Sequence, residues 1–333
     1  MRKSPAAIVF VLLIAAGLAL AAWPQMFGLE RTIVVAQVVA LRVGVLGVAL
    51  GVLTASLLLA LWPPIRRAAL TVAAMLAVFA LVTGGIHLSR GTGTSLSPEP
   101  GDITVLAWNT LGNTPGEQAL IELIVETGAD IVALPETTGP FADSVAASLH
   151  RDGAEFQVFS SGDGAWGARH TSLLISARLG GYTADPTLGV TMVLPTVAAR
   201  PDDGAGPVII ATHPIAPGPR QVPLWRAELD MIARLCNDLD SAIIAGDFNS
   251  TLDHWASLGT ADGDLGRCAD AARQAGAGTT GTWPSDLPSW LGAQIDHVVA
   301  TEDWQVVDAY VVTDRDHLGS DHRPVVAILR PRP

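Results

Sequence analysis

Basic residues are scarce in most of this 333-residue sequence. Lys3 is the only lysine, and every other basic residue is an arginine. After Arg90, 31 acidic residues face only 13 basic ones, which gives this part a formal charge of −18. A protein that holds long nucleic acid through its phosphates needs a basic surface, so the composition argues against such a partner. The many carboxylates fit either cation binding or a solvated acidic surface.

Cysteine is scarce as well, and we find no internal repeat. Cys236 and Cys268 are the only two cysteines, too few for a disulfide framework. One bridge would form if this part of the chain lies outside the cytoplasm. Two buried free thiols fit the sequence equally well.

Three long apolar runs, which contain almost no charge, fill the first ninety residues at about 6–23, 43–62 and 68–88. Each approaches or reaches the ~20 residues that cross a bilayer. A cleavable signal peptide would explain the first run alone, and a buried globular core is the other alternative. Three such runs together favour a membrane anchor of three transmembrane helices over residues 1–90.

The bases near these runs predict the orientation of the anchor. Arg2 and Lys3 precede the first run, and Arg66 and Arg67 separate the second from the third. Such bases stay on the cytoplasmic side, so the N-terminus is predicted to be cytoplasmic and everything after the third run extracytoplasmic. Residues 91–101, rich in Gly, Ser, Thr and Pro, are predicted to be a flexible tether to a domain over residues 102–330.

From residue 102 onward, short apolar runs alternate with helical spacing. Helices are predicted at 117–127, 141–149 and 226–239. Strands are predicted at 103–108, 131–134, 156–159, 171–175, 191–193, 208–212, 242–245, 295–300, 304–312 and 325–329. Many strands with helices between them predict an α/β fold in which two packed β-sheets are covered by helices.

Polar side chains recur where these apolar runs begin or end. They are Asn109, Glu136, His213, Asp247 with Asn249, Asp296, and the pair Asp321-His322. Each one alone is explained by a turn, a helix cap or a satisfied loop residue. Strand ends on one edge of a sandwich can converge, however, and loops on a rigid scaffold often carry chemistry. Asp247 and Asn249, two residues apart, point to the same side of an extended chain.

These residues lie in motifs that occur in a recognisable order. They are Trp108-Asn109, Pro135-Glu136, Thr212-His213, Gly246–Asn249 (GDFN), Ile295–His297 (IDH) and Ser320–Val325 (SDHRPV). Over residues 102–329 the series resembles the endonuclease/exonuclease/phosphatase superfamily with its DNase I-like fold. Three spans before such a domain resemble a bacterial membrane-anchored branch that includes proteins linked to teicoplanin resistance. Asp253-His254 and Thr282–Pro284, which contains Trp283, are similar to motifs of that branch.

The resemblance implies a four-layer α/β sandwich that hydrolyses a phosphate ester with Mg²⁺ or Mn²⁺. Glu136 and Asp321 would supply the hard oxygen ligands that suit Mg²⁺, with Asn109 as a further ligand or a phosphate donor. The remaining roles also follow from the resemblance: Asp247 would activate the attacking water, Asn249 would hold a phosphate oxygen, His322 would donate to the developing charge, Asp296 would fix the His322 tautomer, and His213 would contact the phosphate or the leaving group.

Two departures from the family's nucleases favour a phosphate-containing small molecule or lipid as substrate over DNA. The domain is acidic with no lysine, and His213 has no second acidic partner that the sequence identifies. An exported nuclease and a non-catalytic membrane binding protein are the competing interpretations. Adjacent Asp321 and His322 can act together only if their loop twists. Four further histidines, His170, His254, His297 and His317, are assigned structural roles, with His254 as the first exception to consider.

Overall fold

The computed structural model describes residues 5–164 and 167–332. The chain divides into two compact units, Met1–Ser89 and Arg90–Pro333, and each is described here by itself. Arg2 and Lys3, which support half of the predicted orientation, lie outside the described residues.

The first unit is helical. Its helices are α1 (Pro5–Ala22), the 3₁₀ helix η1 (Pro24–Phe27), α2 (Val35–Ala40), α3 (Arg42–Leu59) and α4 (Arg66–Ser89). Among the described residues α3 and α4 are long and apolar enough to cross a membrane, whereas the apolar part of α1, Ile8–Ala22, is shorter. The three apolar runs therefore all form helices, but two candidate spans stand where three were predicted.

The helices of the first unit pack through apolar side chains. Ala22, Ala49, Leu76 and Phe79 form their buried cluster. Many larger side chains point outward instead, among them Leu58 of α3 and Leu81 of α4, which are 64% and 77% exposed. An apolar exterior of this kind is costly in water and suits hydrocarbon.

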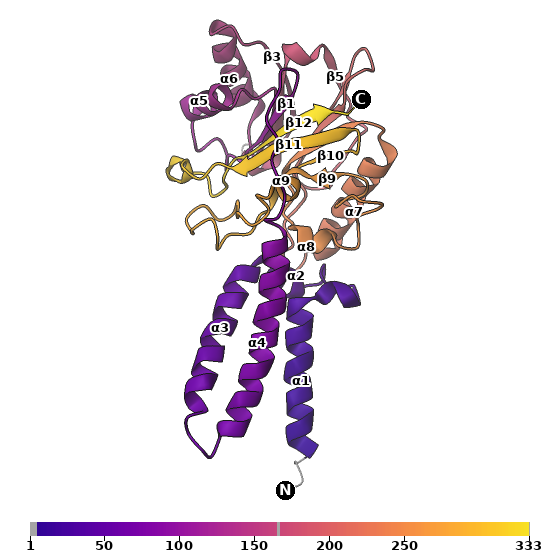
Figure 1. Ribbon diagram of the computed structural model, residues 1–333. Helices are drawn as coiled ribbons and strands as arrows, with labels where there is room; N and C mark the ends of the chain where they lie inside the picture. Colours follow the sequence, from indigo (N-terminus) through magenta and orange to yellow (C-terminus); the bar gives the residue numbers. More distant parts are fainter. Residues whose placement is uncertain (1–4, 165–166, 333) are drawn as a thin grey trace. The chain divides into compact units, whose positions relative to one another are not determined.

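The second unit contains two six-stranded mixed sheets (Figure 1). In the first the strand order is β11 (Trp304–Val311), β12 (Val325–Pro331), β1 (Ile103–Ala107), β2 (Ile131–Pro135), β4 (His170–Ser176) and β3 (Phe156–Gly162). In the second it is β5 (Tyr182–Ala184), β6 (Val197–Pro201), β7 (Val208–Thr212), β8 (Ala242–Asp247), β10 (Asp296–Ala300) and β9 (Ala269–Asp270). Parallel pairs β1–β2 and β7–β8 lie at the middle of the two sheets.

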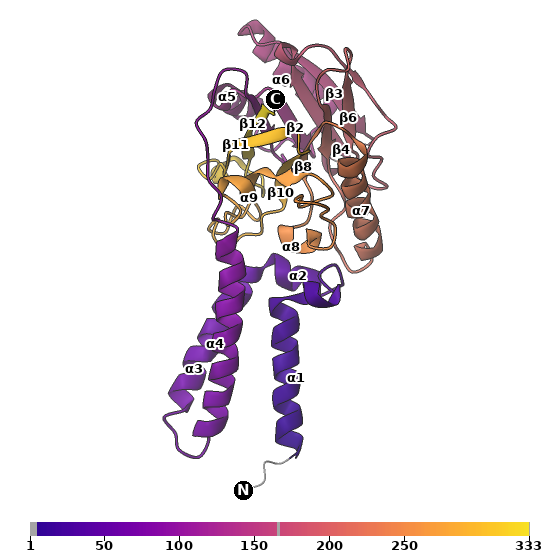
Figure 2. The ribbon, with the colours of Figure 1, turned by 45° about the vertical axis from the view of Figure 1, so that its right-hand side comes forward.

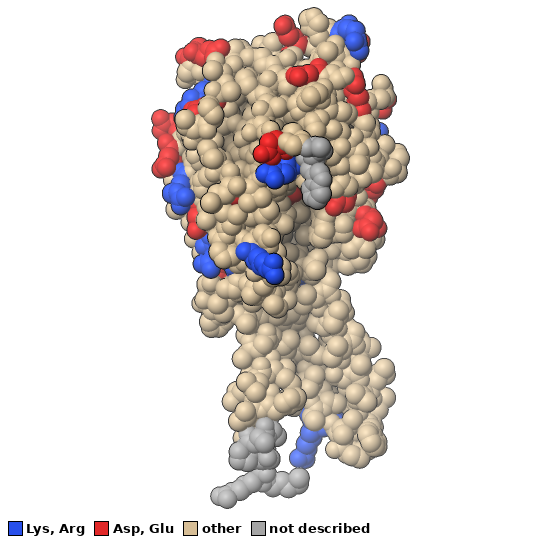
Figure 3. All heavy atoms as spheres, turned by 180° about the vertical axis from the view of Figure 1, so that it is seen from behind, with Lys and Arg blue, Asp and Glu red and all other residues tan. Residues whose placement is uncertain are grey.

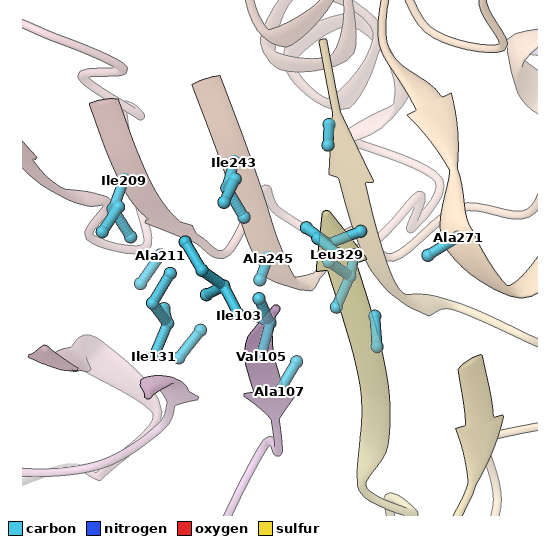
Figure 4. Packing of buried hydrophobic residues seen from close by; sticks show 14 of the residues in the cluster. Ile103, Val105, Ala107, Ile131, Ile209, Ala211, Ile243, Ala245, Ala271 and Leu329 are labelled. Atoms are coloured by element: carbon cyan, nitrogen blue, oxygen red, sulfur yellow. The ribbon is translucent and has the colours of Figure 1, made fainter. Parts of the chain in front are cut away.

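The main core lies between the sheets. Alternate side chains of each strand point inward, as the two-residue period of a strand requires. Val105 and Ile131 of one sheet meet residues such as Ile209 and Ile243 of the other, and all are buried (Figure 4). The intervening residues, including Leu106 and Val132, point to the outer face of the sheet. Because both faces of the sheet are covered, the sequence of these strands is continuously apolar.

Helices cover the outer faces. On one side of the sheets lie α5 (Glu117–Thr127) and α6 (Gly139–Arg151), and on the other lies α7 (Val222–Asp238) (Figures 1 and 2). Leu123 of α5 and Leu149 of α6 pack on the first sheet, and α7 buries Trp225, Leu229 and Ile232. Short helices α8 (Leu252–Trp255) and α9 (Ala271–Ala275) and 3₁₀ turns at 167–169, 177–179 and 316–318 complete the unit. The architecture is two packed mixed sheets flanked by helices.

The predicted strand at 191–193 is wrong. Residues 185–196 form a loop instead, held by a turn in which Thr191 Oγ1 donates to the Leu194 carbonyl. Gly189, with a φ of +65°, and Pro195 interrupt extended pairing on either side of the β-branched residues. The strands on both sides, β5 and β6, were not predicted.

Residues 91–101 are not the free tether that their composition predicts. They have no regular structure, yet they are bonded along the second unit: Thr94 N donates to the Gln274 carbonyl and Leu96 N to the Val307 carbonyl. Arg330 donates to the Ser97 carbonyl. Polar, glycine-rich composition predicted the lack of helix and strand, but backbone hydrogen bonds to the domain hold the segment in place.

Cys236 of α7 and Cys268, ahead of β9, form a disulfide, which decides between the two alternatives that the sequence left open. Both residues are fully buried. Replacing both with alanine should destabilise the second unit by about 3–4 kcal/mol, because closing a loop of this length restricts the unfolded chain. Denaturant unfolding of the wild-type and double-alanine proteins would measure the difference in stability. The cysteines of the unreduced wild-type protein should not react with a thiol reagent. Equal midpoints, or two reactive thiols in the unreduced protein, would contradict it.

Candidate functional site

The ends of six strands bring the predicted site residues to one edge of the two sheets. Asn109 and Glu136 follow the parallel strands β1 and β2, and His213 follows β7 while Asp247 ends β8. Asp296 begins β10, which is antiparallel to β8 and pairs it directly with Asp247. Asp321 and His322 precede β12, antiparallel to β1. Parallel neighbours end at the same edge and antiparallel ones begin there, so the topology makes these residues converge.

A glycine permits the turn that carries Asp247 and Asn249. Gly246 has a φ of +139°, and a Cβ there would lie 2.2 Å from the Thr212 carbonyl oxygen of β7. After it, Asn249 takes a φ of +46°, and its backbone N–H donates to Asp247 Oδ1 at 2.8 Å. Trp225 Nε1 donates to the Asn249 carbonyl at 3.1 Å, which fastens the turn to α7. The side-chain Nδ2 of Asn249 donates to the Pro214 carbonyl at 3.0 Å.

Glu136 is also held in an uncommon backbone conformation, with a φ of +58°. Its carbonyl accepts hydrogen bonds from Gly112 N at 3.0 Å and from Thr110 Oγ1 at 3.1 Å. Left-handed conformations of residues other than glycine are costly and concentrate at functional sites. Two of the predicted site residues, Glu136 and Asn249, are thus held in such conformations by their surroundings.

Asp247 is the centre of the cluster. Its Oδ2 accepts a hydrogen bond from Asn109 Nδ2 at 3.1 Å and lies 3.5 Å from His213 Nε2 and 3.7 Å from His322 Nε2. Burial alone would raise the pKa of Asp247, but the neighbouring His322 and His213 outweigh it and lower this pKa to about 2. Asp247 is therefore a carboxylate at neutral pH.

His322 is held between carboxylates. Its Nδ1 bonds Asp296 Oδ2 at 2.8 Å, and its Nε2 lies 3.8 Å from Asp321 Oδ1. Burial would lower the pKa of His322, but Asp296 and Asp247 raise it to about 10. The imidazole therefore carries a proton on each nitrogen at neutral pH. Since Nε2 makes no hydrogen bond to the described residues, its N–H is free to donate to a bound anion.

The bend before β12 resolves the problem that Asp321 and His322 are neighbours in the chain. Both reach the site because residues 321 and 322 are bent, not extended. Ser320 organises this bend: its hydroxyl donates to the Asn109 carbonyl at 2.6 Å and accepts from His322 N at 3.1 Å. Trp108 Nε1 donates to the His322 carbonyl at 3.0 Å.

Asp321 is oriented by Trp283, a residue for which the sequence predicted no role. Trp283 Nε1 donates to Asp321 Oδ2 at 3.0 Å. Asp321 Oδ1 is buried and has no hydrogen-bond partner among the described residues. Arg323 is also buried and donates to several carbonyls of the Trp283 loop, including those of Gly281 and Ser285, so SDHRPV fixes this loop as well.

Among the described residues, the structure brings one group of acidic and histidine side chains close enough together to hold a metal ion. The ligand atoms of Asp247, Asp296 and His322 all lie within 4.8 Å of one another. The predicted ligands Glu136 and Asp321 carry oxygens that suit Mg²⁺, and Asp321 Oδ1, which has no hydrogen-bond partner among the described residues, fits a cation. Asn109, predicted as a further ligand or a phosphate donor, contacts the carboxylates of Glu136 and Asp247. Its Nδ2 donates to Glu136 Oε1 at 3.1 Å as well as to Asp247, while its Oδ1 accepts from Leu111 N. It orients both carboxylates.

His254 and His297 have structural partners, as predicted. His254 Nδ1 accepts from Thr251 N at 2.8 Å in a capping box at the start of α8. His297 is fully buried, with Nδ1 bonded to Asp270 at 2.7 Å and Nε2 to the Ser250 carbonyl at 2.9 Å. Since Ser250 follows Asn249, the bond from His297 to the Ser250 carbonyl stabilises the turn that contains Asn249. Sequence patterns alone could not assign this partner, because Asp270 and Ser250 are distant in the chain.

Comparison with known proteins agrees with this geometry. A family model described as Endonuclease/Exonuclease/phosphatase family matches residues 106–322. No curated protein matches the chain significantly. Similar solved structures include an endonuclease/exonuclease/phosphatase from Bacteroides vulgatus, with 17% identity, a TM-score of 0.52, and coverage of 69% of this chain and 99% of that one. A second, from Beutenbergia cavernae, has 22% identity, a TM-score of 0.50, and coverage of 69% and 72%.

A humanized D. rerio TDP2 is similar at 14% identity and a TM-score of 0.54, with coverage of 69% of this chain and 99% of that chain. At these identities the solved structures show the shared fold, and the family model carries the assignment. The predicted DNase I-like fold is confirmed. The chain belongs to the endonuclease/exonuclease/phosphatase family.

Proposed function

We propose that this protein is a membrane-anchored, extracytoplasmic, divalent-metal-dependent phosphoesterase that hydrolyses a phosphate ester or pyrophosphate of a small or lipid-linked molecule. The observation that carries the proposal is the convergence of Asp247, His322 and Glu136 with their partners at one sheet edge. A carboxylate next to a buried imidazolium, with further carboxylates beside them, is suited to phosphoester hydrolysis, because it supplies an acceptor for water, a donor to phosphate and oxygen ligands for a metal ion.

The side chains divide the reaction between them. Asp247, ionised and buried, accepts a hydrogen bond from the attacking water and orients it toward phosphorus. His322 donates its Nε2–H to a phosphate oxygen and neutralises charge that develops there. Asp296 holds the imidazole in place through Nδ1. His213, whose Nε2 lies 3.5 Å from Asp247 Oδ2, supplies a donor to the phosphate or to the leaving oxygen. Asn249 Nδ2 is already bonded to the Pro214 carbonyl and to Asp247 Oδ2, so Asn249 holds the turn that carries Asp247.

Glu136 and Asp321 would hold Mg²⁺ or Mn²⁺, with Asn109 orienting Glu136. Such an ion, when bound, neutralises phosphate charge and polarises the ester. The alternative group of Asp247, Asp296 and His322 is less suited, because Asp296 and Asp247 raise the pKa of His322 to about 10, and a doubly protonated imidazole has no lone pair for a metal ion.

Charge supports a small or lipid-linked substrate over long DNA. On the face drawn in Figure 3, acidic and basic side chains are interspersed over the second unit. DNA is a partner in a solved structure of D. rerio TDP2 with single strand DNA product, which has a TM-score of 0.53 with this chain. An exported nuclease is therefore the second candidate function. The carboxylate-rich composition of the domain argues against it.

Two observations support the anchored, extracytoplasmic placement. Candidate spans α3 and α4 precede the domain, and the Cys236–Cys268 disulfide is of a kind that persists outside the cytoplasm. We assign the protein to the membrane-anchored branch of the family on the same grounds. A topology reporter fused after Pro333 should report an extracytoplasmic C-terminus, and a cytoplasmic signal would contradict the placement.

A substrate panel tests the function itself. Full-length protein in lipid nanodiscs should release phosphate from a phosphomonoester and a lipid pyrophosphate, and it should cleave duplex DNA at least about 10²-fold more slowly. Nuclease activity above the phosphatase activity would favour the second candidate. Turnover of none of these substrates would leave only a binding protein and refute the proposal.

Trp283→Phe provides a prediction specific to Asp321. Losing the indole N–H frees the carboxylate, and partners of metal ligands of this kind typically contribute 10–100-fold to metal affinity or activity. We expect the Mg²⁺ concentration for half-maximal activity to rise about tenfold, with most of the maximal rate retained at saturating Mg²⁺. Trp290→Phe, at a tryptophan that is 60% exposed, is the matched control. An unchanged Mg²⁺ requirement in Trp283→Phe would refute this role.

A further inference from the structure

We propose that a cleft beside the catalytic residues binds the apolar chain of an amphiphilic phosphate ester, so that the substrate is a lipid phosphate; this rests on the proposed phosphoesterase function. The cleft has a volume of about 650 Å³. Its walls are the edge strand β3, the ends of β5 and β6 that face it, and the loop 185–196. This volume lies within the range of small-molecule sites.

Hydrogen bonds connect the cleft to the catalytic residues on two sides. Thr196 Oγ1, in the cleft wall, lies 3.3 Å from Thr212 Oγ1, the residue before His213. On the other wall, Ser160 Oγ lies 2.9 Å from Ser172 Oγ, which donates to the carbonyl of Thr137, the residue after Glu136. Both walls of the cleft are therefore hydrogen-bonded, directly or through Ser172, to the residues next to His213 and Glu136 in the chain.

A buried glutamate fixes the loop beside the site. Glu228 of α7 is 2% exposed, and its two oxygens accept from Met192 N at 2.8 Å and from Ile215 N at 2.7 Å. Ile215 follows Pro214, whose carbonyl accepts from Asn249 Nδ2. The Glu228 carboxylate thus bonds the loop 185–196 to the segment Pro214-Ile215, which contacts the turn that carries Asn249. These bonds hold the cleft wall in a fixed position relative to that turn.

The loop presents apolar side chains to solvent. Leu188, Val190, Val193 and Leu194 line the cleft, and Val190 and Val193 are 62% and 42% exposed. Met192, between the lining residues Thr191 and Val193 in the chain, is 76% exposed. Neighbouring exposed apolar residues on a soluble surface mark a binding site for something apolar.

The charges around the cleft are already paired within the protein. Arg169 lies 3.0 Å from Asp163, and Asp185 lies 2.5 Å from Arg200. A nucleic acid strand would need unpaired cations to follow its phosphates. An alkyl or prenyl chain needs none, and its burial against valine, leucine and proline side chains is favourable.

Alkylphosphonates test the cleft separately from turnover, because they cannot be hydrolysed. Isothermal titration of full-length protein in nanodiscs, corrected with empty nanodiscs, would compare butyl-, octyl- and dodecylphosphonate in the presence of Mg²⁺. We expect affinity to rise about twofold for each added methylene. This corresponds to half of the free energy of full burial, which would raise affinity roughly fourfold. Val190→Ser should weaken dodecylphosphonate about threefold to tenfold and leave butylphosphonate unchanged.

Val125→Ser is the matched control, since Val125 on α5 has the same 62% exposure as Val190. The cleft proposal is refuted if affinity is independent of chain length, if Val190→Ser leaves the chain-length dependence intact, or if Val125→Ser has the same effect. It is also refuted if Val190→Ser weakens only the binding of the protein to lipid vesicles that contain no phosphonate, because the loop would then contact the bilayer. Hydrolysis of butyl phosphate by the wild-type protein separately tests the phosphoesterase function, which can stand or fail independently of these binding results.

Discussion

Asp247→Asn should lower the rate of phosphate release by at least about 10²-fold, the usual scale for a positioned general base. The carboxamide keeps the size of the side chain, so the fold should persist. It loses the negative charge that lies 3.5 Å from His213 and 3.7 Å from His322, and with it the acceptor for a proton of the attacking water. Steady-state release of inorganic phosphate at saturating substrate and Mg²⁺ would measure the effect.

Asp143→Asn, at an exposed position on α6, is the matched control and should retain wild-type activity. Circular dichroism of both variants would confirm that each is folded. Wild-type turnover by Asp247→Asn would remove the residue at the centre of the proposed mechanism and refute that mechanism.

His322→Gln should lower turnover by about 10²–10³-fold, the range for removing one donor to a developing oxyanion. The substitution removes the imidazolium that Asp296 and Asp247 keep protonated by raising the pKa of His322 to about 10. Because the lost interaction strengthens in the transition state, kcat should fall more than KM rises. Initial rates over a range of substrate concentrations separate the two parameters.

The exposed His150 on α6 provides the matched substitution, and His150→Gln should leave both parameters unchanged. A rise in KM at constant kcat in His322→Gln would assign His322 to ground-state binding and contradict its proposed role as a donor in the transition state.

Much of the fold could be predicted because burial on both faces leaves a clear signal in the sequence. The apolar runs that became β2, β7 and β8 are continuous, since helices cover one face of each sheet and the other sheet covers the second. Helix α5 was predicted with its observed bounds because Gly128 ends it in a left-handed conformation.

Edge structure was predicted less well. Strands β5 and β6 are short or half exposed, so they lack the apolar continuity of the central strands. The loop that contains Val190 and Val193 has β-branched residues but makes no ladder, and composition alone could not distinguish the two. That misassigned segment is also the wall of the proposed chain-binding cleft, where apolar residues are exposed for binding and not buried for folding.

The site was predicted from residue identity and strand ends, yet its supporting contacts depend on tertiary pairing. Register brings Asp247 opposite Asp296, and this follows from the antiparallel pairing of β8 and β10, which no local pattern specifies. The bond from Trp283 to Asp321 and the buried pair of His297 with Asp270 likewise join distant segments. The number of metal ions and the substrate are chemical properties that these contacts constrain but that residue spacing does not specify.

Metal removal and restoration tests the central claim most directly, since the claim is that Glu136 and Asp321 hold an ion that the reaction requires. Wild-type protein in nanodiscs, treated with EDTA and freed of chelator, should release phosphate at least about 10²-fold more slowly, and Mg²⁺ or Mn²⁺ should restore the rate. Glu136→Gln should remain slow at Mg²⁺ concentrations that restore the wild type. Undiminished phosphate release after chelation, with Glu136→Gln as active as wild type, would contradict the account.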